Sequence, residues 1–213
     1  MLPADASLLE SLLWRPEDGY FLLPEHLARM QRGAAHFGVP LDLTATDEAL
    51  RGCAASLVAA GAAGAWKVRL LVDATGAAST THEPAKSNLP VRAALAASPV
   101  DGDDALLRHK TTARAVYDTA LASVRHLAVQ DVLLWNERRE LTETTSANLV
   151  LHLGGVLVTP HVDSGLLAGT FREALLRQGA IREAVVPLDD LAQATDIWLV
   201  NSVRRWCRVH LVR

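Results

Sequence analysis

Strand-like runs crowd the second half of this 213-residue chain and limit the folds that are open to it. They follow one another as "DVLLWN", "ELTETTSANLVLHL", "VLVTP", "EAVVPL" and "IWLVNSVRRWCRVHLV". The segments "NERRE" and "GG" supply the turns between the first three. One short helix is expected among them, in "AGTFREALLRQG", which opens at Gly169 and closes at Gly179. The second half is therefore predicted to be strand-rich with few helices.

The first half mixes helices and strands. A helix is expected from Pro24 to Gly38, because proline suits a first helical position and glycine a C-terminal cap. A second helix is expected from Asp47 to about Ala60, in an alanine-rich stretch. The runs "LLESLLW", "YFLL" and "WKVRLLVD" have strand character. Together these elements predict a small α/β domain at the start of the chain.

Residues 74–104 are rich in Ala, Ser, Thr, Pro, Gly and Asp, which is typical of a weak strand followed by a linker. We therefore predict an N-terminal α/β domain over residues 1–97, a linker over 98–104 and a strand-rich domain over 105–213. The fold class that follows is α+β.

Composition excludes several classes of function. Half of the residues are apolar, about a fifth are charged and the net charge is −3, which gives no basic surface for nucleic acid. Apolar runs stay below the ~18 residues of a membrane span, and the first residues lack the basic start of a signal peptide. Neither the two distant cysteines nor the eight histidines have metal-site spacing. We expect a cytoplasmic protein without metal.

Lys110 stands in "LRHKTTARAVYD", where an extended run is expected to give way to a helix. A lysine amine becomes a nucleophile when burial or neighbouring charge lowers its pKa. An ordinary solvated lysine is the alternative, and from this residue alone it is favoured.

Two further segments suit the binding of a charged ligand. Glu143 lies among hydroxyl donors in "ELTETTSANLVL", where a carboxylate is suited to hold a cationic ring nitrogen. Gly169 and Thr170 open a predicted helix, and the amides at such an end can bind an anion. An exposed strand residue and a plain helix cap are the respective alternatives.

In their order and spacing these segments resemble the class IV, fold-type IV pyridoxal-phosphate enzymes. The matching pieces are "HLARM", "RHKTTAR", "LTETTSANL", "GLLAGTFRE" and "LVNSVR", which extend over most of the chain. Branched-chain aminotransferases, D-amino acid aminotransferases and 4-amino-4-deoxychorismate lyases share this pattern. The opening and the "NSVR" segment look most like the lyase type. The resemblance implies a two-domain fold like that of D-amino acid aminotransferase, and a homodimer.

The resemblance also implies roles for particular residues. Lys110 would form the Schiff base with pyridoxal 5'-phosphate and act as general base and acid, while Glu143 would hold the pyridine nitrogen. Arg29 would bind the phosphate. The remaining cofactor-binding residues implied in this way are Ser146, Asn148, Gly169, Thr170 and Ser202.

The activity implied first is release of pyruvate and 4-aminobenzoate from 4-amino-4-deoxychorismate, a small-molecule substrate of folate precursor synthesis. A transaminase acting on branched-chain or D-amino acids is the second hypothesis, and a non-catalytic relative is the third. The chain departs from the family at its start, where a strand pair is expected to be trimmed. It also departs at Leu13, where related lyases have an arginine. Candidate replacements that would bind substrate carboxylate are Lys67, Arg69, Arg204 and Arg205.

Overall fold

The computed structural model describes residues 2–212 and divides the chain into two compact units. The first takes in the chain up to Ser87 together with His109–Ala113, and the second comprises Asn88–Arg108 and Arg114 onward. The expected linker, residues 98–104, therefore lies inside the second unit. Among the described residues, no helix is long and apolar enough to cross a membrane.

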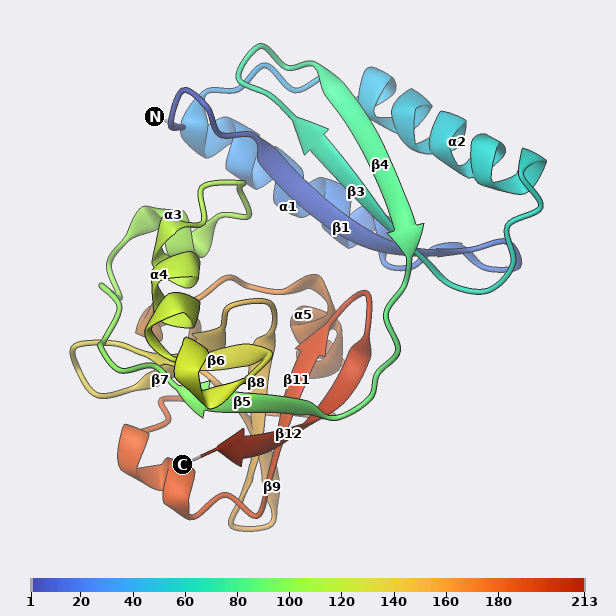
Figure 1. Cartoon of the computed structure of the whole chain (residues 1–213). Coiled ribbons are helices and arrows are strands. Elements are labelled where there is room, and N and C mark those ends of the chain that lie inside the picture. The colour runs from blue at the N-terminus through green and yellow to red at the C-terminus, as the bar shows by residue number, and fades with distance from the viewer. Residues whose placement is uncertain (1, 213) are drawn as a thin grey trace. The chain divides into compact units, whose positions relative to one another are not determined.

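The first unit is a four-stranded sheet with two helices. Figure 1 labels β1, β3 and β4 of this sheet together with α1 and α2. Its strands are antiparallel neighbours in the order β2-β1-β3-β4. The elements are β1 (Leu8–Arg15), β2 (Gly19–Tyr20), α1 (Leu23–Phe37), α2 (Leu43–Ala59), β3 (Trp66–Val72) and β4 (Ala78–Pro84). This arrangement confirms the first strand and the first helix that the sequence predicts. Of the run "YFLL", only Tyr20 lies in a strand, and Leu23 already belongs to α1.

Alternation along the strands decides which face of this sheet the helices cover. Leu8, Leu12 and Val68 point to one face and pack in a single core with Met30 of α1 and Leu50 of α2. Leu9, Ser11 and Leu13 alternate with them in β1 and so point to the opposite face.

Local chemistry sets the ends of the two helices. Pro24 lies in the first turn of α1, and Gly38 ends it in a left-handed conformation with φ 72°. The second helix begins earlier than the predicted Asp47, because the Asp42 carboxylate accepts hydrogen bonds from the amides of Thr44 and Ala45. This N-cap satisfies two amides that otherwise have no partner within the helix.

The second unit is built on an eight-stranded sheet in the order β10-β9-β8-β11-β12-β5-β6-β7 (Figure 1). Strand β7 pairs with β6 and also with β8, so six of the strands close into a barrel. The strands are β5 (Val91–Leu95), β6 (Asp131–Trp135), β7 (Leu141–Thr144), β8 (Asn148–Leu153), β9 (Val156–Pro160), β10 (Arg182–Ala184), β11 (Asp196–Asn201) and β12 (Arg205–Val212). The helices are α3 (Ala105–Arg108), α4 (Ala115–Ser123) and α5 (Thr170–Arg177).

Side chains fill the barrel and bind α4 to its outside. Ala93 and Leu133 belong to a core cluster with residues of β7, β8, β11 and β12. The alternate residues of the same strands, Ala94 and Leu134, pack instead with Val116 of α4. This two-sided burial explains why β5 and β6 are apolar on both faces.

Several elements differ from the predictions. Strand β5 pairs with β6 and β12, so part of the expected first domain belongs to the barrel of the second unit. The single run "ELTETTSANLVLHL" turns back on itself and forms β7 and β8. The segment before Lys110 is the short helix α3 and not an extended run, and α4 begins only at Ala115.

Candidate active site

Lys110 is fixed through its backbone to β1 of the first unit. Its carbonyl accepts a hydrogen bond from the Leu9 amide at 3.0 Å. The Thr112 amide donates to the Ser7 carbonyl at 2.9 Å, and Thr111 forms a bridge with Leu8. The lysine is therefore held by an edge contact with a strand, and not by the strand end that the sequence suggests.

Arg29 of α1 and Glu10 of β1 form a buried ion pair. Arg29 Nε lies 2.8 Å from Glu10 Oε1, and Nη2 lies 2.6 Å from Oε2, so the contact is bidentate. His26, one helical turn earlier, places Nδ1 2.6 Å from the same Oε2. A guanidinium has five N–H donors, and these two bonds use two of them. Arg29, predicted to bind phosphate, is thus oriented by a carboxylate.

Burial and the neighbouring charges shift the pKa values of Glu10 and His26. Burial acts to raise the pKa of Glu10, but the Arg29 guanidinium and the hydrogen bonds from Arg29 and His26 outweigh it and hold the pKa at about 2. Burial lowers the pKa of His26 despite its bond to Glu10, and the charges of Arg29 and Lys110 lower it further. Because Arg29 and Lys110 both act on His26, two predicted site residues meet around this histidine.

Glu143 lies on β7 in the second unit with 5% of its surface exposed. Its Oε1 accepts a hydrogen bond from the Tyr117 phenol at 2.9 Å and one from the Leu167 amide at 3.3 Å. Both of these donors are neutral groups, and each hydrogen bond stabilises the ionised form of the carboxylate. A buried carboxylate of this kind is suited to a cationic ring nitrogen.

Asp131 holds the turn between β7 and β8. Its buried carboxylate accepts hydrogen bonds from the amide and hydroxyl of Thr145 and from the hydroxyls of Thr144 and Ser146. Ser146, predicted to contact the cofactor, is therefore exposed but oriented by this aspartate.

The predicted anion site at α5 is tightly built. Asn148 on β8 donates its amide to the Leu167 carbonyl at 2.7 Å. A Cβ added to Gly169 would lie 2.0 Å from Asn148 Oδ1, so only glycine fits at this position. Thr170 follows as the first residue of α5 and is buried. This segment presents amides at the positive end of a helix dipole.

Ser202 occupies the turn between β11 and β12 and is buried. The preceding Asn201 shapes the turn, because its side-chain oxygen accepts bonds from the amides of Val203 and Arg204. Its amide group donates to the Ser146 carbonyl at 3.3 Å. The second unit therefore brings the turn that carries Ser202 against the turn that carries Ser146.

The candidate substrate cations lie on β3 and in the turn after β11. Arg69 stands opposite Ser11 of β1, and Lys67 stands opposite Leu13. Lys67 Nζ is paired with Glu83 on β4 at 2.7 Å, which satisfies that cation. Leu13 itself is 3% exposed, so an apolar side chain fills the position where related lyases have arginine.

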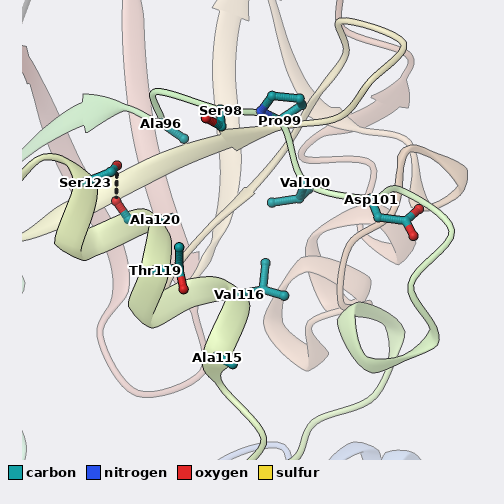
Figure 2. Close-up of a pocket in the computed structure, with 10 residues that line it drawn as sticks. All are labelled: Ala96, Ser98, Pro99, Val100, Asp101, Ala115, Val116, Thr119, Ala120 and Ser123. Atoms are coloured by element: carbon teal, nitrogen blue, oxygen red, sulfur yellow. Dashed lines mark hydrogen bonds between the residues drawn. The ribbon is translucent and has the colours of Figure 1, made fainter.

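A cavity of about 380 Å³ lies elsewhere in the second unit, between α4 and the segment after β5. In Figure 2, Val100 and Val116 point toward each other from its two walls. Its lining is Ala96, Ser98, Pro99, Val100, Asp101, Ala115, Val116, Thr119, Ala120 and Ser123. None of the predicted site residues belongs to this lining, and small side chains without a cation dominate it. It is not the candidate active site.

The predicted residues thus fall into two sets in different compact units. Arg29 and Lys110 gather in the first unit, and the other cofactor-binding candidates gather in the second. Sequence reasoning missed the partners that orient them: Glu10, Tyr117 and Asp131. A signal for Glu10 was present, because it is the third residue of β1 and alternates with Leu9 and Ser11, on the same face as Leu8 and Leu12, which pack with α1. Nothing local marked Tyr117 or Asp131.

The chain combines an α+β fold and a closed sheet with Lys110, whose backbone is bonded to β1, and with the buried carboxylate of Glu143. These features are those of a class of enzymes. The family model for class IV aminotransferases matches residues 7–212, and the chain belongs to that family. It is therefore an enzyme, and the resemblance seen in its motifs is confirmed. The family in general depends on pyridoxal phosphate.

Some of the individual relatives are named as lyases and others as aminotransferases. A Schizosaccharomyces pombe protein provisionally named aminodeoxychorismate lyase is 36% identical over 109 residues, which span 49% of this chain and 47% of that relative. The chain thus matches about half the length of this curated relative.

Solved structures show the fold over the whole chain. One from Mesorhizobium loti, provisionally named an amino-acid aminotransferase, is 33% identical, with a TM-score of 0.88 over 98% of this chain and 100% of that one. A Mycobacterium tuberculosis protein described as a hypothetical aminotransferase, with alpha-ketoglutarate and PMP bound, is 25% identical, with a TM-score of 0.83 over 99% of this chain and 85% of that one. A Legionella pneumophila protein provisionally named 4-amino-4-deoxychorismate lyase is 21% identical, with a TM-score of 0.83 over 96% of this chain and 82% of that one, and supports the fold alone.

Proposed function

We propose that this enzyme binds pyridoxal phosphate and acts as an aminodeoxychorismate lyase, which converts 4-amino-4-deoxychorismate to 4-aminobenzoate and pyruvate. The observation that carries the cofactor proposal is Glu143, a buried carboxylate that accepts hydrogen bonds from Tyr117 and the Leu167 amide. The lyase assignment is supported by the yeast relative and by the lyase-like opening and "NSVR" segments.

The residues present fit the cofactor by their chemistry. Glu143 would hold the ring nitrogen, and Lys110 would hold the aldehyde. Arg29 and the amide of Thr170 would bind the phosphate, together with Ser202. Ser146 and Asn148 would line the ring. Gly169 would let the backbone approach closely, since the space a Cβ needs there is taken by Asn148.

When bound, pyridoxal phosphate withdraws electrons from the carbon that bears the substrate amine. Lys110 would then remove the proton from this carbon. Elimination would break the carbon–oxygen bond to the enolpyruvyl group, which leaves as an enolate while the carbon ring becomes aromatic. The proton taken up by Lys110 would return to this enolate, which departs as pyruvate. The ion pair with Glu10 would keep Arg29 in place meanwhile, since a bidentate contact fixes the guanidinium plane.

Substrate carboxylate is assigned in this proposal to Arg69, with Arg204 as the second candidate. Arg69 stands between Ser11 and Thr81 on neighbouring strands, and both neighbours are hydroxyl donors. Lys67 is the weaker candidate because Glu83 already pairs with it. A cation on β3 would thus replace the one that related lyases carry at the position of Leu13.

The chain offers an unusually clean test, because Lys67, Lys86 and Lys110 are its three lysines. We expect the loaded protein to be yellow, and borohydride reduction to fix the cofactor on the peptide that contains Lys110. Lys110→Ala is expected to lose the colour and to lower activity at least about 10²–10⁴-fold, the contribution of a positioned acid–base group. Lys86→Ala, a change at an exposed lysine, serves as the matched control.

A protein that cannot be loaded with pyridoxal phosphate, or a Lys110→Ala variant as active as the control, would contradict the proposal.

A transaminase acting on branched-chain or D-amino acids is the second candidate, favoured by the Mesorhizobium loti relative. Pyruvate release from aminodeoxychorismate is measured against keto-acid formation from a panel of L- and D-amino acids. Keto-acid formation without pyruvate release would replace the first candidate by the second.

We also propose that the enzyme is a homodimer located in the cytoplasm, by the resemblance to its family. Light scattering of the purified protein measures the first property, and fractionation of cells measures the second. A monomer with full activity would contradict the dimer.

A further inference from the structure

The Tyr117 side chain joins α4 to the buried carboxylate of β7. Its phenol donates to Glu143 Oε1 at 2.9 Å, 26 residues away in sequence. The Leu167 amide donates to the same oxygen, so one oxygen of the carboxylate is held from two directions. Two donors on one oxygen restrict the rotation of a carboxylate that a single bond would leave mobile.

Arg114 fixes the ring that carries this phenol. Its guanidinium carbon lies 4.7 Å from the centre of the Tyr117 ring. The same guanidinium donates to the carbonyl of Thr145, two residues beyond Glu143. Thr145 is in turn bonded through its amide and hydroxyl to the buried Asp131. The phenol and its acceptor are therefore both attached to one turn of the barrel.

The phenol keeps its proton over the working range of pH. Burial and the neighbouring Glu143 carboxylate raise the pKa of Tyr117 well above its ordinary value. Tyr117 is therefore protonated at neutral pH and donates its hydrogen to Glu143. The bond stabilises the ionised carboxylate, which is the form that pairs with a protonated ring nitrogen.

We propose that Tyr117, braced by Arg114, is a positioning residue that holds the Glu143 carboxylate in place for the ring nitrogen of pyridoxal phosphate. It acts through Glu143 and not on the substrate. The inference rests on the proposed function, because it requires that Glu143 meets this ring nitrogen.

The test compares two tyrosine variants of the full-length apoprotein. Tyr117→Phe removes the phenol and leaves the ring for Arg114. Tyr20→Phe is the matched control, because Tyr20 is the other of the two tyrosines and its phenol donates to the Leu50 carbonyl in the first unit. Each protein is titrated with pyridoxal phosphate and with its 1-deaza analogue, in which C–H replaces the ring nitrogen. Both ligands keep the aldehyde and the phosphate.

We expect Tyr117→Phe to weaken the binding of pyridoxal phosphate about tenfold, the size of a lost hydrogen bond to a charged group. Binding of the deaza analogue is expected to change less than about twofold, because it offers Glu143 no N–H. Tyr20→Phe is expected to leave both affinities unchanged. In a Glu143→Gln background the Tyr117→Phe effect on pyridoxal phosphate is expected to shrink to about twofold or less, since coupled residues are not additive.

Equal losses for both ligands would overturn the inference, because they would indicate a structural role for Tyr117. An unchanged affinity for pyridoxal phosphate would overturn it as well. In both cases wild-type binding of pyridoxal phosphate would leave the proposed function standing. If the wild-type apoprotein binds neither ligand, the proposed function fails and the inference fails with it.

Discussion

The two units each bury a glutamate, and they treat it differently. In the first unit Glu10 is paired with a guanidinium and an imidazole, so its charge is matched inside the protein. In the second unit Glu143 takes hydrogen bonds from a phenol and a backbone amide, which orient the carboxylate. Both side chains are at most 5% exposed.

The difference separates two uses of a buried carboxylate. A carboxylate matched by an arginine stabilises the position of that arginine, and removing it leaves a buried cation without an anion. A carboxylate oriented by a phenol and an amide has its oxygen fixed in direction, as the recognition of a cationic ligand requires. Glu10 therefore supports a binding residue, whereas Glu143 is suited to bind directly.

Among the changes that test this comparison, Glu10→Gln is expected to have the largest effect on the free energy of unfolding. Glu10→Gln keeps the shape of the side chain but leaves Arg29 buried without its anion. The free energy of unfolding is expected to fall by about 3–5 kcal/mol, the usual cost of breaking a buried pair. Chemical denaturation of the apoprotein measures it.

Glu83→Gln is the control for this change, because it breaks the more exposed pair with Lys67 and is expected to lower stability by at most about 1 kcal/mol. If Glu10→Gln is no more destabilising than Glu83→Gln, the buried pair of Glu10 and Arg29 does not stabilise the fold more than an exposed pair does.

Lowering the pH is expected to remove the contribution of Glu10 to the free energy of unfolding gradually. The pKa of Glu10 is about 2 in the folded protein, below the ordinary 4.5 that it regains on unfolding. Its contribution of about 3 kcal/mol is therefore complete above pH 4.5 and is lost as the pH falls toward 2. The pKa of His26 is also lowered in the folded protein. The unfolded state therefore takes up a proton at His26 more readily, and the free energy of unfolding falls further as the pH drops below the ordinary pKa of 6.5.

The measurement is the unfolding free energy of wild type and Glu10→Gln between pH 7 and pH 3. The gap between the two proteins is expected to narrow as the pH falls. A constant gap would show that Glu10 titrates normally.

The smallest change in stability is expected for Glu143→Gln. The glutamine carbonyl can still accept from Tyr117 and Leu167, so the unfolding free energy should stay within about 1 kcal/mol of wild type. Affinity for pyridoxal phosphate is expected to fall about tenfold, because the charge that meets the ring nitrogen is lost. A loss of stability as large as that of Glu10→Gln would erase the distinction between the two carboxylates.

Much of the fold could be predicted because local patterns agree with the final structure. The α+β class, the first helix with Pro24 and Gly38, and the strand-rich second half are confirmed. Strand β5 could not be assigned to its sheet, because its parallel partners β6 and β12 are distant in sequence. The turn between β7 and β8 was missed because the Asp131 carboxylate, and not a glycine or proline, stabilises it.

The sequence predicted which residues belong to the candidate site, but it did not predict the residues that orient them. Lys110 and Glu143 stand in motifs that a sequence displays directly. Tyr117 reads as one more apolar position on a helix, and only the fold shows that its phenol meets Glu143. The roles assigned to these residues stay predictions until the cofactor experiments are done.

The closure of the barrel has a consequence for how the enzyme moves. Strands β7 and β8 meet at the pair Glu143 and Asn148, so two of the candidate cofactor residues lie on the seam that closes the sheet. Neither residue can shift by sliding one strand along the other, because each strand is also bonded to a different neighbour. The seam therefore holds the Glu143 and Asn148 backbones at a fixed spacing, so the two side chains start from fixed positions relative to each other.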